Sequence, residues 1–230
     1  MVYKMIQLQS IKDIYKKKIP YKYDLMQKHM AGLKEKAVNG SVIKERDTVL
    51  VFCCGTGMEF SPLEERLGEG GKIIGVDFSE KMLEMAEKKI DQNNWQNIDL
   101  IYADVTQFDY SLHMKTKADA GICNLGFSII PKYKDAFYNL TSSVRDGGEV
   151  IIGDMQLAQG PMAMFNPISI FLSRSFGGTF EGHKNTTNLY NLMKQELENT
   201  RKEEYMFKSY FIAYGKKASL FLNQTHFDKL

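Results

Sequence analysis

The chain has 230 residues, of which 43% are apolar, and its 30 Lys and Arg residues nearly balance its 28 Asp and Glu residues. A chain of this length can bury the core of one α/β domain, and a second full domain is not expected. The near balance of charge gives no broad electrostatic reason to expect nucleic acid or an anionic membrane as a partner.

Several features of the sequence bear on where the protein works. The first ten residues lack the long apolar core of a signal peptide, and no run approaches the roughly 18 apolar residues of a membrane span. The three cysteines are too few and too clustered for a disulfide framework. We therefore expect a soluble, cytoplasmic protein without integral membrane association, and the sequence leaves its oligomeric state open.

The N-terminal part of the chain has the pattern of two helices. Apolar residues recur partly at helical spacing from Lys4 to Lys18, and Pro20 then breaks this pattern. A second helix is expected from Tyr23 to Val38.

The next stretch has the order of a nucleotide-binding unit. An apolar run from Val49 to Phe52 predicts a buried strand, and the turn Gly55-Thr56-Gly57 lets the main chain approach a ligand closely. A helix and a second strand, from Lys72 to Val76, should follow, and that strand ends in Asp77. In such units the acid accepts hydrogen bonds from ribose hydroxyls. The glycines alone are a weak signal, because Phe60 stands where a dinucleotide fingerprint has its third glycine.

Three further strands are predicted in the middle of the chain. The first runs from Ile98 to Ala103 and is followed by Asp104, and the next runs from Ala118 to Cys123 and is followed by Asn124. Another strand is expected from Glu149 to Asp154. In an open α/β sheet the ligand lies at the carboxyl ends of the strands where the strand order switches, here between the first strand and the fourth.

The pattern changes in residues 155–184, which are rich in Met, Phe and Ile and are interrupted by Pro and Gly. This stretch predicts either a substrate lid or an extra helix, from Met162 to Ser173, that completes the core. A lid of this composition favours a substrate with an apolar portion. Asn185 and Thr186 should then cap a helix, and strands from Glu203 to Phe207 and from Tyr210 to Tyr214 should follow.

Three groups of residues carry a resemblance to a known family: Cys54-Gly55-Thr56-Gly57, then Gly75-Val76-Asp77-Phe78-Ser79 with Met82-Leu83, and Asp104. With these residues the chain resembles the class I S-adenosylmethionine-dependent methyltransferases, and within them the ubiquinone/menaquinone C-methyltransferase-like group. The resemblance extends from about Tyr23 to Lys217 and is strongest from Thr48 to Asp154.

The resemblance implies an α/β, Rossmann-like fold with a seven-stranded, mostly parallel sheet whose last strand is antiparallel and which is flanked by helices. Residues 1–230 would form a single methyltransferase domain. Its parts would be an N-terminal helical lid (1–46), a cofactor-binding core (47–154), a substrate lid (155–184), and a closing helix, strands and tail (185–230).

The resemblance also implies the cofactor, S-adenosylmethionine, and the residues that bind it. These are Cys54, Gly55, Thr56, Gly57, Asp77, Phe78, Met82, Asp104, Val105, Asn124 and Tyr23. Phe78 would lie against the adenine ring or fill the core, and Asp104 would contact the adenine amino group or cap a turn. Tyr15, Tyr21 and Tyr23 would touch the cofactor or only pack in a lid helix.

The chain departs from the family at two positions. The family has an acidic residue where this chain has Val51, and a glycine where it has Cys53. The acid helps to hold the methionine amino group, and its loss implies either weaker cofactor binding or a substitute such as Glu59. A non-catalytic S-adenosylmethionine-binding protein with a degenerate first motif is therefore the alternative. A nicotinamide-dependent oxidoreductase is disfavoured by Phe60 and by the residues around Asp77.

The sequence leaves the catalytic group unknown. Methyl transfer from a sulfonium needs no dedicated residue, and His183 and Asp154 are weak candidates for a base, with a surface histidine and a turn carboxylate as the competing interpretations. Soft thiols near one cleft suggest a metal hypothesis, but the cysteine and histidine spacing favours no metal. The resemblance disfavours methylation of adenine or of a glutamine amide, because Asn124-Leu125-Gly126-Phe127 follows the fourth strand in place of an Asn-Pro-Pro-Tyr motif. We therefore expect a small-molecule or lipid-like methyl acceptor and no nucleic acid.

Overall fold

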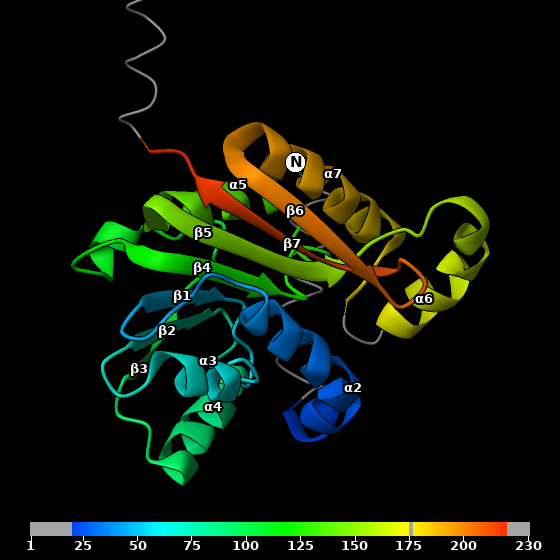
Figure 1. Cartoon of the computed structure of the whole chain (residues 1–230). Helices are drawn as coiled ribbons and strands as arrows, with labels where there is room; N and C mark the ends of the chain where they lie inside the picture. Colours follow the sequence, from blue (N-terminus) through cyan, green and yellow to red (C-terminus); the bar gives the residue numbers. More distant parts are fainter. Residues whose placement is uncertain (1–19, 175–176, 220–230) are drawn as a thin grey trace, which may run out of the picture.

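A computed structural model describes residues 20–174 and 177–219, with side chains from Met30 onward other than that of Leu172. A seven-stranded sheet in the order β3-β2-β1-β4-β5-β7-β6 lies at its centre (Figure 1). The strands are β1 (Thr48–Phe52), β2 (Lys72–Asp77), β3 (Ile98–Tyr102), β4 (Ala118–Asn124), β5 (Val144–Met155), β6 (Leu197–Tyr205) and β7 (Tyr210–Lys217).

The sheet is mostly parallel, with one reversed strand near its edge. β1 pairs in parallel with β2 on one side and with β4 on the other. β7 runs antiparallel to both β5 and β6. The predicted fold class, a seven-stranded mixed sheet with an antiparallel last strand, is confirmed, and the strand order switches between β1 and β4 as predicted.

Helices cover both faces of the sheet (Figure 1). On one face, α2 (Pro20–Asn39), α3 (Phe60–Leu67) and α4 (Glu80–Asn93) enclose a core cluster that includes Val49, Val51 and Ile122. On the other face, α5 (Tyr133–Ser143) and α7 (Phe180–Glu196) enclose a second cluster. A strand that is buried on both faces has a continuous run of apolar residues, and β1 and β2 could therefore be predicted from the sequence.

Three element starts differ from the predictions by five or six residues. β6 begins at Leu197, six residues before the predicted start at Glu203. β5 begins at Val144, five residues before the predicted start, because Val144 pairs with Ala118 and Gly148 packs against the β4 main chain. There a Cβ on Gly148 would lie 2.5 Å from the Asp119 carbonyl oxygen. The helix predicted to have its cap at Asn185 and Thr186 is instead capped six residues before Asn185, by Thr179, whose hydroxyl accepts the Gly182 N–H.

Neither prediction for residues 162–173 describes the structure completely. The segment is helical, as η2 (Gly160–Phe165) and α6 (Asn166–Ser173), and it projects from the body of the molecule (Figure 1). It does not complete the core, because Met164 and Phe171 are 73% and 69% exposed. None of the helices within residues 20–174 and 177–219 combines the length and the hydropathy that a membrane span requires.

Candidate functional site

The glycine turn predicted from the sequence lies at the carboxyl end of β1. Gly55 and Gly57 have φ angles of 55° and 70°, in the left-handed region that favours glycine. A Cβ on Gly57 would also lie 2.4 Å from the ring of Phe60, which is fully buried beneath the turn. Phe60, which occupies the place of the third fingerprint glycine, thus packs against the turn and fixes its shape.

Asp77 joins the end of β2 to this turn. It is only 7% exposed, and its carboxylate accepts the N–H of Gly55 and the N–H of Ser79, each at 2.9 Å. Burial raises the pKa of Asp77 to about 6, and the backbone hydrogen bonds oppose that rise. The carboxylate is therefore held rigidly beside the turn, at the edge of the sheet where the sequence places a ribose-binding acid.

The residues predicted to surround the adenine lie at the ends of β2 and β3. Phe78 is partly exposed, whereas Met82 on α4 and Val105 are buried. Asp104 accepts hydrogen bonds from the N–H and the hydroxyl of Thr106, at 3.0 Å and 2.8 Å, so the turn-cap interpretation describes its contacts. The adenine contacts of these residues stay a prediction. Tyr15 lies outside the described residues, as do the side chains of Tyr21 and Tyr23.

Asn124 ends β4 next to the glycine turn and is 2% exposed. Neither its amide nitrogen nor its amide oxygen has a hydrogen-bond partner within the described part of the chain. Beside it, Gly153 leaves room for polar groups, because a Cβ there would lie 2.1 Å from Asn124 Oδ1 and 2.5 Å from the Tyr210 hydroxyl. That hydroxyl, fully buried, also lacks a partner in the same residues. Two unpaired buried polar groups therefore converge at the carboxyl end of β5.

Two of the three thiols lie close together at the ends of β1 and β4. Cys53, with a φ of 52°, and Cys123 lie so that a Cβ on Gly126 would be 2.8 Å and 2.7 Å from their sulfurs. Burial raises the pKa of the Cys123 thiol, and its hydrogen bond with Cys53 adds to the rise, so it stays protonated. The described residues hold no group of three or more His, Cys, Asp or Glu that could bind a metal ion.

The two weak candidates for a base are both fully buried. The alternative of a surface histidine is wrong for His183, because the first turn of α7 packs against the β4–α5 loop and buries it. Its Nε2 lies 3.1 Å from the Ser173 hydroxyl, and burial lowers its pKa. Asp154 accepts the N–H of Ser128 at 3.0 Å and the N–H of Met155 at 2.7 Å. Asp154 thus has the contacts of a structural carboxylate.

The buried carboxyl of Asp154 predicts a pH dependence of stability. Burial raises its pKa to about 6, so the folded protein holds the proton more tightly than the unfolded chain does. The contribution of this group is full below about pH 4 and is lost as the pH rises through about 6, a loss of about 3 kcal/mol. Asp77 acts in the same direction.

Asp154→Asn removes that titration, so the free energy of unfolding should fall less between about pH 4 and pH 7 in the variant than in the wild type. Urea titrations across this range measure both curves. If the free energies of unfolding of the variant and the wild type differ by the same amount at every pH, only a hydrogen bond was lost. Such parallel curves would contradict the raised pKa.

The sequence makes Glu59 a candidate but does not predict that it pairs with a buried lysine. Lys34 on α2 is 3% exposed, and its Nζ lies 2.9 Å from Oε1 of Glu59, which is 1% exposed and precedes α3. The only sequence signal for Lys34 is its place among Leu33, Ala37 and Val38, which form the buried face of the helix. Tyr210 gave no signal beyond its place in a predicted strand.

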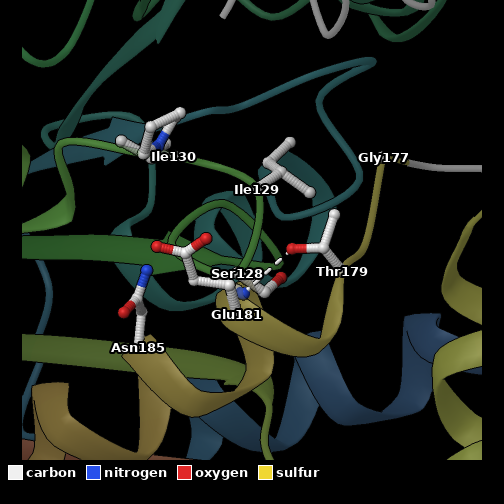
Figure 2. A pocket seen from close by; sticks show the side chains of 9 residues that line it. Ser128, Ile129, Ile130, Gly177, Thr179, Glu181 and Asn185 are labelled. Atoms are coloured by element: carbon white, nitrogen blue, oxygen red, sulfur yellow. Dashed lines mark hydrogen bonds between the residues drawn. The ribbon is translucent and has the colours of Figure 1, made fainter. Parts of the chain in front are cut away.

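A shallow hollow lies beside the site, between the β4–α5 loop and the start of α7. Figure 2 shows Ser128, Ile129 and Ile130 of the loop opposite Thr179 and Glu181 of the helix. This hollow adjoins the buried Asp154 through Ser128, whose N–H donates to that carboxylate. The hollow is therefore next to the end of β5. In the chain, α6 comes directly before the α7 residues that line the hollow.

Comparison with known proteins identifies the chain's relatives. A demethylmenaquinone methyltransferase of Bacillus cereus is 29% identical over 149 residues, which cover 62% of this chain and 61% of that protein. One from Shouchella clausii is 26% identical over 168 residues, covering 71% of this chain and 69% of that protein. The first of these matches therefore spans less than two thirds of the relative's length.

Solved structures share the fold at low identity. The N-methyltransferase NodS from Bradyrhizobium japonicum, in complex with S-adenosylhomocysteine, aligns with a TM-score of 0.64 and 12% identity, covering 93% of this chain and 99% of that one. A SAM-dependent methyltransferase from Aquifex aeolicus aligns with a TM-score of 0.60 and 16% identity, covering 80% of this chain and 89% of that one. The class I methyltransferase fold is thereby confirmed.

The decisive match is with a family model. The model described as "Methyltransferase domain" matches residues 43–206, the range that contains the glycine turn, Asp77, Asn124 and the sheet that aligns them. This range is more than half of the chain, and it includes every strand except β7. The chain therefore belongs to the methyltransferase domain family.

Proposed function

We propose that the protein is an S-adenosylmethionine-dependent methyltransferase that binds its cofactor across the carboxyl ends of β2, β1 and β4. The observation that carries the proposal is the buried carboxylate of Asp77, fixed by the N–H of Gly55 beside a turn that only glycine fits. The residues proposed to hold the cofactor are those implied by the resemblance: Cys54, Gly55, Thr56, Gly57, Asp77, Phe78, Met82, Asp104, Val105, Asn124 and Tyr23.

The residues present fit this cofactor. Asp77 offers acceptors to a ribose, and the unpaired amide of Asn124 offers both a donor and an acceptor to a polar group near β4. When bound, S-adenosylmethionine supplies an electrophilic methyl group on its sulfonium. The protein's share is then to hold the cofactor and the acceptor in line and to exclude water.

No dedicated base is assigned. The oxygens of Asp154 accept backbone N–H groups, and His183 is buried beside Ser173, so neither is placed like a group that faces an acceptor. An acceptor that is acidic enough to lose its own proton needs no such base.

We further propose that the acceptor is amphipathic. The relatives named demethylmenaquinone methyltransferase support a quinone-like acceptor. The exposed apolar side chains of Met164, Ile168 and Phe171, on the segment that precedes the hollow beside Asp154, support an acceptor with an apolar portion. Phe165 of this segment stacks on Phe207, which is 70% exposed, at 5.4 Å between ring centroids.

The parts of the chain follow from this proposal. Residues 1–46, of which α2 packs on the sheet, would cover the cofactor, and residues 47–154 would bind it. Residues 155–184 would cover the acceptor side, and residues 185–230 would close the sheet. Cytoplasmic location and the absence of a nucleic-acid partner stay predictions from the sequence.

The cofactor is tested by calorimetric titration of the purified protein with S-adenosylmethionine, S-adenosylhomocysteine and NADH. We expect micromolar affinity for the first two ligands, about 8 kcal/mol, and no binding of NADH. Binding of NADH alone would replace the proposal with an oxidoreductase, and binding of none of the three would leave a methyltransferase fold without its cofactor.

A further inference from the structure

The buried pair of Lys34 and Glu59 is a feature that the proposed contacts of the cofactor do not use. Both side chains are almost completely buried, and their charged atoms lie 2.9 Å apart. Yet neither oxygen of Glu59 has an aligned hydrogen bond in the part of the chain that the structure describes, so the contact with Lys34 is an ion pair by distance alone. A buried carboxylate whose hydrogen-bonding capacity is not used is costly.

The pair lies where α2 and α3 pack on one face of the sheet. Glu59 follows the glycine turn and begins α3, whereas Lys34 comes from α2, which packs on the same face of the sheet. Phe60, which follows Glu59, packs in the same core cluster as Leu33 of α2 and Tyr210 of β7. The charge of Glu59 also raises the pKa of Tyr210, after burial and the charge of Asp154. The Tyr210 hydroxyl converges with Asn124 beside Gly153.

The strand order indicates which end of the cofactor would lie near Glu59. If Asp77 on β2 takes the ribose, the adenine lies toward β3, because β2 has β3 as its outer neighbour. The rest of the molecule must then extend the other way, across β1 toward β4, β5 and β7. At that end S-adenosylmethionine carries an amino acid, with an ammonium group that has three N–H donors.

Resting on the proposed function, we infer that Glu59 binds the ammonium group at the methionyl end of the cofactor and that Lys34 positions Glu59. Asn124 and the Tyr210 hydroxyl face the same polar end of the ligand. This arrangement supplies a carboxylate from the start of α3, while the β1 position of Val51 is buried among apolar side chains and supplies none. A charge-assisted hydrogen bond in a dry site is among the stronger polar contacts.

The test compares S-adenosylhomocysteine with methylthioadenosine, which keeps the adenosine and the sulfur but lacks the amino acid. In Glu59→Gln the affinity for S-adenosylhomocysteine should fall about 30-fold, because the neutral amide oxygen lacks the negative charge that strengthens the hydrogen bond to the ammonium group. The affinity for methylthioadenosine should stay within about twofold, because the adenosine contacts are unchanged. Calorimetry measures both ligands on each protein.

A matched control and a milder variant accompany it. Glu65→Gln removes the same charge from an exposed position on α3 and should change neither affinity. Tyr210→Phe removes only the unpaired hydroxyl, and it should also weaken S-adenosylhomocysteine more than methylthioadenosine, which keeps the test usable if Glu59→Gln does not fold. Thermal unfolding of each variant reports its folding.

Three results would overturn the inference. Equal losses for both ligands would mean that Glu59 supports the fold of the whole site, and no loss for either would mean that Glu59 does not touch the cofactor. If the wild type binds methylthioadenosine and S-adenosylhomocysteine equally, the methionyl end has no site here although the proposed function stands. Binding of neither ligand to the wild type would instead defeat the proposed function.

Discussion

Asp77→Asn should weaken the binding of S-adenosylmethionine about 100-fold, or about 2.7 kcal/mol. The wild-type carboxylate accepts the N–H of Gly55 and the N–H of Ser79 and keeps lone pairs for a ribose. An amide has one acceptor oxygen, and its NH2 group would face one of these N–H donors. The variant thus loses the ribose contact and loosens the glycine turn at the same time.

Calorimetric titration measures the effect, and methylthioadenosine should lose affinity to the same extent because it shares the ribose. Asp99→Asn is the matched control, because Asp99 lies on β3 with an exposed carboxylate that pairs with Lys72. It should leave both affinities unchanged. Unaltered binding in Asp77→Asn would contradict the placement of the ribose at the end of β2.

Gly182→Ala should lower the stability of the folded protein more than an ordinary surface change. A Cβ at Gly182 would lie 1.8 Å from the carbonyl oxygen of Ser128. That main chain cannot move away freely, because the Ser128 N–H is bonded to the buried Asp154. Overpacking of this kind costs on the order of 3 kcal/mol. For a chain of this size the melting temperature should fall by about 6–12 °C.

Gly32→Ala is the control for this substitution. Gly32 lies in α2 with nothing within 4 Å of the added Cβ, so the change should stabilise the helix by up to about 1 kcal/mol. Thermal unfolding of both variants gives the comparison. If Gly182→Ala melts at the wild-type temperature, the first turn of α7 does not pack against the β4–α5 loop as described.

The sequence predicted the fold and the β1–β2 part of the site because local rules decide them. A strand that is buried on both faces consists of apolar residues, so its residue types predict it. The turn at Gly55 and Gly57 needs positive φ angles, and the glycines therefore predict the turn. The register of β1 between β2 and β4 follows from the same topology. The packing of Phe60 beside Gly57 was not predicted, because the sequence marks Phe60 only as a departure from the dinucleotide fingerprint.

The rest of the site depends on contacts between distant segments. Lys34 and Glu59 meet only because α2 packs beside α3, and a lysine on a mostly polar helix gives no local sign of burial. Burial of His183 depends on the close approach of Gly182 to Ser128, 54 residues earlier in the chain. The composition of residues 160–173 is compatible with a lid and with a core helix, and only the tertiary structure shows that apolar side chains such as Met164 and Phe171 are exposed.

The most direct test of the central claim is transfer of the methyl group itself. The protein is incubated with S-adenosylmethionine carrying a deuterated methyl group and with demethylmenaquinone in its oxidised and reduced forms, and the organic extract is analysed by mass spectrometry. A methyltransferase for an amphipathic acceptor yields a deuteromethylated product and an equal amount of S-adenosylhomocysteine. Tight binding of S-adenosylmethionine with no labelled product from these or other amphipathic acceptors would contradict the claim and indicate a non-catalytic binding protein.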